Sequence, residues 1–226
     1  MGQYYHIFNF DKKQQIYPFD YENGLKLMEW AYNRNYVVLT LTNLLTHEWK
    51  GDRVYVIGDY ADQDNSDEVW INAYRSLLAE CGLHTESDSV YDAAINSFER
   101  VLPSSDIENA IHQDMKKVSV SGTKVDITDH EYRYIYNHAT KQVIDLNKCP
   151  VEWTMRDGRT VSISPLVLLL TMGNGRGGGD YRNKQNQSLL GNWCDTVQSI
   201  EVAKDLLDNC KDYVEFIPNF TERNGK

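Results

Sequence analysis

The stretch YYHIFNFDKKQQI at residues 4–16 recurs without a gap as YRYIYNHATKQVI at residues 132–144. Tyr, Phe and Ile favour strands, and the polar residues in the middle of each stretch favour a turn, so each stretch is predicted to be a β-hairpin. The identical pairs are Tyr4/Tyr132, Ile7/Ile135, Asn9/Asn137, Lys13/Lys141, Gln14/Gln142 and Ile16/Ile144.

Two further blocks follow each hairpin in the same order. Residues 29–38 match 152–161, where Asp157-Gly158 signals a tight turn, so this block is predicted to be a second hairpin in both halves. A short helix is expected next, at residues 41–47 in the first half and, after Ser164-Pro165, at 166–171 in the second. The third block pairs Trp49-Lys-Gly-Asp-Arg-Val with Trp193-Cys-Asp-Thr-Val. Three blocks in one order predict an internal duplication.

The segment between the two copies has a different pattern. It opens with acidic residues that suit the start of a helix, and Val69, Ala73 and Leu77 then recur at helical spacing. The predicted fold is therefore α+β, with two pseudo-symmetric, mainly antiparallel β units joined by a helical connector. The predicted boundaries, within one compact domain, are 1–61 for the first unit, 62–122 for the connector and 123–220 for the second unit.

Composition excludes several classes of protein. The 226 residues carry a net charge of −10, which disfavours binding to long nucleic acids but is compatible with a basic protein partner. The longest apolar run, residues 165–172, is too short to cross a bilayer, and the N-terminus lacks the features of a signal peptide. The four cysteines are widely spaced, which favours reduced thiols and a cytoplasmic location over a disulfide framework or a zinc ribbon.

The largest difference between the halves is the segment GNGRGGGDY at residues 173–181, which has no counterpart in the first half. Its five glycines permit close approach to the backbone N–H groups, which can form an anion-binding nest, and Arg176 can add a bidentate contact. It is neither a P-loop nor a dinucleotide fingerprint. A glycine loop needed only for a tight crossing is the alternative. The predicted ligand-binding residues are Asn174, Gly175, Arg176, Gly177, Gly178, Gly179, Asp180 and Tyr181.

Acidic residues form a second candidate group. Asp52 and Asp195 each follow a tryptophan by two or three residues, and with Asp59 and Asp180 they lie near predicted strand ends. Convergence of these carboxylates would provide ligands for a divalent cation. Gly-Asp is also ordinary turn chemistry, which is the favoured interpretation, so no metal site is assigned. Cys194 is interpreted as buried packing beside Trp193 rather than as a nucleophile.

Four features resemble a family of bacterial proteins with no assigned function. They are the opening Met1-Gly-x-Tyr with Asn9 and Lys13, WKGDRVYVIGDY at residues 49–60, the glycine-rich segment at 173–181, and Trp193 with Asp195. The resemblance covers both halves but not the connector, and it implies no activity, cofactor or catalytic residue.

The leading functional prediction is a cytoplasmic binding protein rather than an enzyme. The glycine-rich segment at 173–181 would hold a small anionic or nucleotide-like ligand, or a group from a partner. One alternative is a metal- or carboxylate-dependent hydrolase or transferase that uses Asp180, Asp52 or Asp195. Another is an acidic inhibitor or immunity-type protein that blocks a basic partner. The sequence leaves the cofactor and the oligomeric state open.

Overall fold

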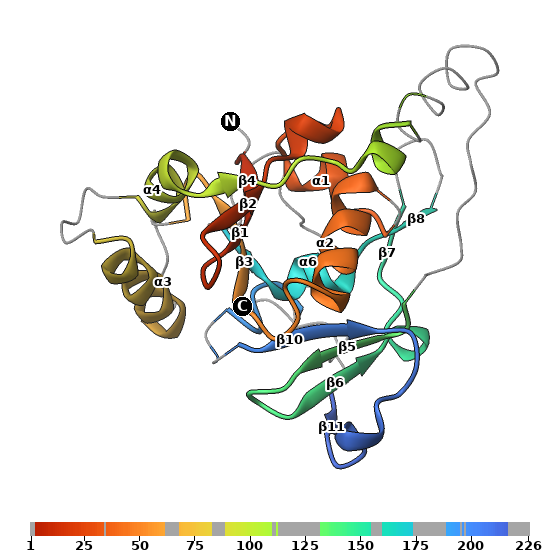
Figure 1. Ribbon diagram of the computed structural model, residues 1–226. Coiled ribbons are helices and arrows are strands. Elements are labelled where there is room, and N and C mark those ends of the chain that lie inside the picture. The colour runs from red at the N-terminus through yellow and green to blue at the C-terminus, as the bar shows by residue number, and fades with distance from the viewer. Residues whose placement is uncertain are drawn as a thin grey trace.

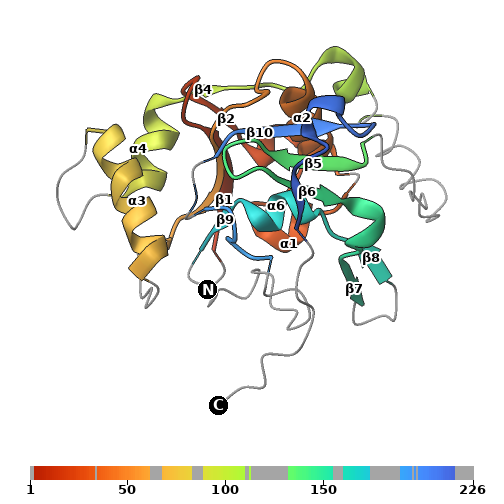
Figure 2. The ribbon, with the colours of Figure 1, turned by 90° about the horizontal axis from the view of Figure 1, so that it is seen from below.

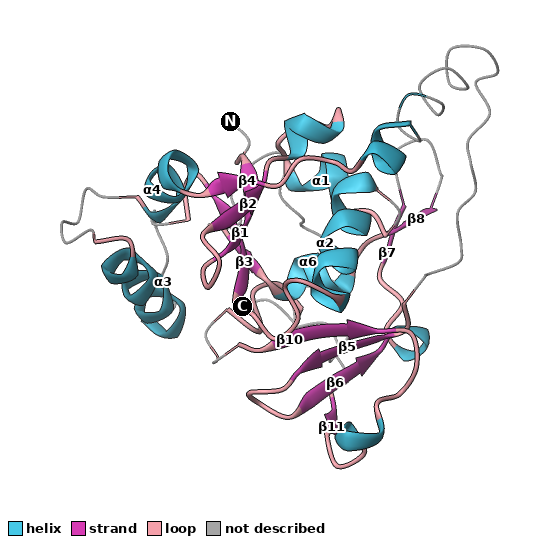
Figure 3. Ribbon diagram, in the orientation of Figure 1, coloured by secondary structure: helices cyan, strands magenta, loops and turns pink. Residues whose placement is uncertain are grey.

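The structure is a computed structural model with two larger sheets of mainly antiparallel strands, a two-stranded ribbon and several helices, so the predicted α+β class is confirmed (Figures 1 and 3). It describes residues 3–33, 35–61, 68–82, 89–109, 112, 132–154, 160–173, 189–194, 196 and 198–216, with the backbone alone at 68–71, 153 and 154.

The first sheet is built around the N-terminal hairpin. Its strands in chain order are β1 (Tyr5–Asn9), β2 (Gln14–Ile16), β3 (Val54–Gly58), β4 (Glu99–Arg100) and β9 (Thr171–Met172). They are arranged β4-β2-β1-β3-β9. The β1–β2 hairpin, with Ile7 opposite Ile16, confirms the predicted hairpin at residues 4–16. β3 runs antiparallel to β1, while β4 and β9 add parallel strands at the two edges.

The second sheet repeats the arrangement of β1, β2, β3 and β4. It contains β5 (Tyr134–Asn137), β6 (Gln142–Asp145), β10 (Ile200–Ala203) and β11 (Val214–Glu215), in the order β10-β5-β6-β11. β5 and β6 form the second predicted hairpin, β10 is antiparallel to β5, and β11 is parallel to β6. Lys13 and Lys141 have positive φ of 54° and 52° at the same place in the two turns. Equal topology is what a duplication requires, although the duplication itself stays a prediction.

The second repeated block does not have one structure in both halves. In the first half the predicted hairpin at residues 29–38 is wrong: α1 (Leu27–Trp30) and α2 (Tyr36–Thr46) lie there instead. The side chain of Asn35 accepts a hydrogen bond from the N–H of Val37, and this cap starts α2 five residues before the predicted helix. In the second half, β7 (Glu152–Thr154) and β8 (Thr160–Ser162) confirm the hairpin.

The main core lies where α2 and α6 (Pro165–Leu169) pack against both sheets, as Figures 1 and 2 show. Ser164 caps α6 by accepting from the N–H of Val167, as predicted, and every residue of α6 is buried. The core draws residues from both halves, among them Ile7, Val56, Leu41, Ile135, Ile200 and Leu168. Burial of each such side chain contributes about 1.5–3 kcal/mol, so the two halves stabilise each other.

The connector covers the other face of the first sheet. α3 (Glu68–Glu80) and α4 (Val90–Ser97) lie on the side of β1 and β3 away from α2, and a second apolar cluster fills the space between (Figure 2). Short 3-10 turns occur at η1 (Pro18–Tyr21), η2 (Leu146–Lys148) and η4 (Asp208–Cys210). Within the described ranges, no helix has the length and apolar character that crossing a membrane requires.

Candidate functional site

The glycine-rich segment starts at an edge of the first sheet. Its eight predicted ligand-binding residues, 174–181, lie outside the described residues, but Gly173 lies within them. β3 and β9 are parallel neighbours, with Ile57 opposite Met172. Gly58 and Gly173, one residue further along each chain, therefore lie side by side at the carboxyl ends of the two strands. The carboxyl ends of adjacent parallel strands are a frequent place for ligands to bind.

Gln3 and Tyr5 form the floor beneath these two glycines. A methyl group on Gly173 would lie 2.5 Å from Gln3 Oε1 and closer still to the Tyr5 hydroxyl, and one on Gly58 would lie 2.8 Å from Tyr5 Cε1. Both floor residues are buried, and the Tyr5 hydroxyl donates a hydrogen bond to Gln3 Oε1. Gln3 Nε2 is also buried, and it has no hydrogen-bond partner within the described part of the chain. An unpaired buried donor costs about 1–3 kcal/mol, so this N–H is suited to an incoming acceptor.

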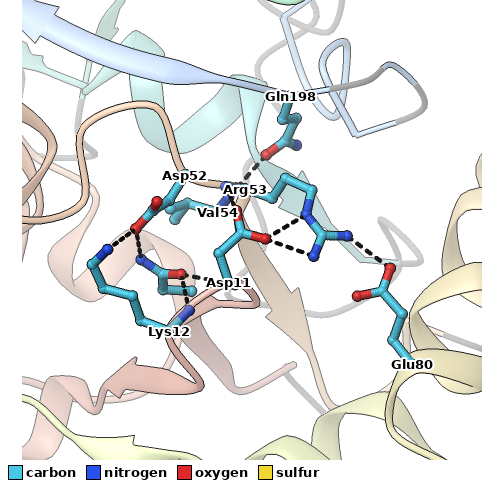
Figure 4. Close-up of polar contacts among 8 residues, drawn as sticks. Asp11, Lys12, Asp52, Arg53, Val54, Glu80 and Gln198 are labelled. Carbon is cyan, nitrogen blue, oxygen red and sulfur yellow. Dashed lines mark hydrogen bonds and ion pairs between the residues drawn. The ribbon is translucent and has the colours of Figure 1, made fainter.

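The two acidic candidates within the described ranges, Asp52 and Asp59, have separate partners. Asp52 accepts a 2.8 Å hydrogen bond from Asn9 Nδ2. Lys12 Nζ lies 3.0 Å from the same carboxylate. Figure 4 shows the pairing of Lys12 with Asp52. Asp59 instead caps the N–H of Tyr4 at 3.0 Å. Asp52 and Asp59 flank β3 at opposite ends, roughly 20 Å apart in extended chain, so the alternative in which these carboxylates converge on one cation is excluded for this pair.

Asp180 and Asp195 lie outside the described residues, and whether Asp195 approaches Asp52 stays untested. Over the ranges that the structure describes, no group of three or more His, Cys, Asp or Glu side chains is arranged to hold a metal ion.

Arg53 ties the β1–β2 turn to α3 (Figure 4). Its Nε and Nη2 donate to Asp11 Oδ1 at 2.8 and 2.7 Å, and its Nη1 donates to Glu80 Oε1 at 2.7 Å. Burial acts to raise the pKa of Asp11, but the hydrogen bonds from Arg53 outweigh it and hold that pKa below its ordinary value. The bonds with Glu80 and then Asp11 raise the pKa of Arg53. All three groups are paired, so this network is structural.

His6 is a core residue rather than a catalytic base. Its Nδ1 lies 3.2 Å from Gln15 Oε1, and Gln15 Nε2 donates to the backbone carbonyls of Ile95 and Phe98. These two bonds fix the Gln15 amide with its oxygen towards the ring, where it accepts a hydrogen bond from the imidazole N–H. Burial lowers the pKa of His6 from 6.5 to about 4, with the Gln15 bond opposing it and the charge of Arg100 adding to it. The ring is therefore neutral at physiological pH.

A group of titratable side chains on the second sheet was not predicted. His138 Nε2 lies 2.8 Å from Glu201 Oε2, and His138 Nδ1 lies 2.9 Å from the Tyr213 hydroxyl and 3.9 Å from Cys210 Sγ. Lys50 Nζ lies 2.7 Å from the other oxygen of Glu201. These residues are spread over most of the chain, so no spacing motif marks them. The one available signal was that His138 aligns with Phe10 in the repeated hairpin.

No protein family model, no curated protein and no solved structure matches this chain. The resemblance to a bacterial family therefore stays a prediction.

Proposed function

We propose that the protein binds a small anionic ligand, of nucleotide-like chemistry, through the glycine-rich segment at 173–181. The observation that carries the proposal is the buried Nε2 donor of Gln3 next to Gly173, which has no hydrogen-bond partner among the described residues. A carboxylate or phosphate oxygen that reached this position would satisfy the donor, and a hydrogen bond to a charged group contributes about 1.5–3 kcal/mol.

The composition of the segment supports an anion rather than a cation. Five glycines leave backbone N–H groups unshielded by side chains, and Arg176 supplies a planar, permanently charged partner for a phosphate or carboxylate. Because the whole chain carries a charge of −10, a long polyanion would be repelled, whereas one small anion needs only a local positive field.

Native mass spectrometry of the protein purified gently from a cell lysate tests the proposal. We expect a small adduct on the wild type that is lost in Arg176→Ala and in Gln3→Met, which removes the amide donor at similar volume. Lys26→Ala is the matched control, because it deletes the same charge at the residue that precedes α1, where the side chain is 42% exposed. Loss of one charged hydrogen bond should weaken binding roughly 10- to 100-fold.

Two results would contradict the proposal: a wild-type protein free of any small adduct, or an adduct that both variants keep. Circular dichroism of Gln3→Met serves as the folding control, since the substitution also removes the acceptor of the Tyr5 hydroxyl.

A further inference from the structure

The two sheets hold corresponding clusters of opposite chemistry. The strand registers allow residues of the first sheet to be matched with residues of the second. Asn9 lies opposite Val54 in the first sheet, and Asn137 lies opposite Ile200 in the second. In the same way, Gln14 lies opposite Glu99, and Gln142 lies opposite Val214. The matched pairs are Phe8/Tyr136, Phe10/His138, Tyr55/Glu201 and Phe98/Tyr213.

The matched rings also share their geometry. The centroids of Phe10 and Phe98 are 5.2 Å apart with planes at 75°, and those of His138 and Tyr213 are 5.6 Å apart with planes at 77°. The first cluster is apolar and lies in the core beneath α3 and α4. The second cluster has the imidazole of His138, the carboxylate of Glu201 and the phenol of Tyr213 at the matched positions.

Titratable groups at such positions are a poor choice for stability. Taking ionisable groups out of water costs free energy that an apolar side chain of similar volume would not. The side chain of Glu201 is only 7% exposed, and Cys210, which the η4 turn adds to the cluster, is 1% exposed. Clusters of this kind gather at functional sites, so the exchange of Phe for His and Tyr for Glu indicates a chemical role.

The hydrogen bonds fix a role for each member. In the tautomer whose Nε2–H donates to the Glu201 carboxylate, His138 presents a lone pair at Nδ1. The Tyr213 hydroxyl and the Cys210 thiol both lie against that lone pair. Tyr136 stacks on the imidazole at 5.8 Å with 4° between the planes, which holds the ring in place. A thiol, a base and a group that orients the base are thereby brought together.

We propose that Cys210, His138 and Glu201 form an acyl-transfer site for a small ester or thioester, separate from the glycine-rich segment. When the substrate enters, the Tyr213 hydroxyl transfers its hydrogen bond from His138 Nδ1 to the carbonyl oxygen of the substrate. The freed Nδ1 takes the thiol proton as Sγ bonds to the acyl carbon, and the Tyr213 hydroxyl stabilises the oxygen as it becomes negative. The leaving group departs with the proton from His138. Water, activated by the same nitrogen, then hydrolyses the thioester and restores the thiol.

Exposure indicates the route to the thiol. The His138 side chain is 22% exposed and Tyr213 is half-buried, whereas Cys210 is buried among the described residues. An acyl donor therefore reaches Sγ along the edge formed by His138 and Tyr213, which suits an acetyl-sized group.

The probe is p-nitrophenyl acetate, with peptide mapping of acid-quenched early time points to measure the rate of acetylation at each cysteine before the acetyl group is hydrolysed. Cys149 is an internal control, because it is buried to a similar degree and burial raises its pKa to about 12. We expect Cys210 to be acetylated at least about 10-fold faster than Cys149, and His138→Phe to remove this advantage. His138→Phe should fold, since the first sheet holds Phe10 at the matched position.

Equal rates at the two cysteines, or an unchanged Cys210 rate in His138→Phe, would overturn the proposal. Glu201→Gln keeps the test decisive if His138→Phe fails to fold. Loss of the carboxylate next to the imidazole should slow acetylation of Cys210 and move the inflection of its pH–rate profile to lower pH. An unmoved profile would exclude a positioning role for Glu201.

Discussion

Acidification should destabilise the protein through His6 before its carboxylates are protonated. Burial lowers the pKa of this histidine from 6.5 to about 4, so between these values the unfolded chain takes up a proton that the folded chain does not. The stability is therefore fully present above pH 6.5 and decreases as the pH falls towards 4. At about 1.4 kcal/mol per pH unit, the full loss is about 3 kcal/mol, of which about 2 kcal/mol is reached near pH 5.

Urea unfolding of the wild type and of His6→Phe, at about pH 7, 6 and 5, measures this loss. Phenylalanine retains the ring contacts that His6 makes with Phe8, Tyr17 and Tyr91, while the lost hydrogen bond to Gln15 lowers stability equally at every pH. Carboxylates titrate alike in both proteins, so the difference between the two curves reports His6 alone. Parallel curves over this range would refute the assignment of a buried, neutral imidazole.

Two substitutions test the packing and the ion pairs of the first sheet. Gly173→Ala places a methyl group against the Tyr5 hydroxyl and should lower the free energy of unfolding by about 1–3 kcal/mol. The loss should be smaller in the Tyr5→Phe background, which lacks that hydroxyl. Equal losses in both backgrounds would disprove the clash. Arg53→Ala removes the ion pairs with Glu80 and Asp11 and should lower the free energy of unfolding by only about 1 kcal/mol, because the network is partly exposed. Amide hydrogen exchange in α3 should become faster. Unchanged exchange would show that Arg53 does not stabilise that helix.

Local sequence signals predicted the elements that depend on local chemistry. Both hairpins follow from strand-forming residues around a polar turn, and α6 follows from Ser164 and Pro165 at its start. The start of α2 was predicted wrongly because β-branched residues such as Val37 and Val38 favour a strand. Packing against both sheets and the Asn35 cap favour a helix instead.

The chemistry of the second sheet was beyond sequence reasoning for a different reason. His138, Glu201 and Tyr213 meet only because β10 and β11 join β5 and β6 in one particular register, and a single sequence does not specify strand register over such distances. Asp52 and Asp59 show the opposite case: they lie close in sequence, but one extended strand between them keeps their carboxylates apart, which agrees with the favoured interpretation of turn chemistry.

The segment that follows α2 links the two sheets directly, since the N–H of Gly51 donates to the carbonyl of Ile200 and the N–H of Ile200 donates to the carbonyl of Asp52. Lys50, from the first half, completes the cluster on the second sheet. Each half therefore depends on the other for backbone hydrogen bonds and for an ion pair. A chain cut between residues 113 and 131 should yield two fragments that are unstructured apart and regain the native fold when mixed, which makes this protein a candidate for fragment complementation.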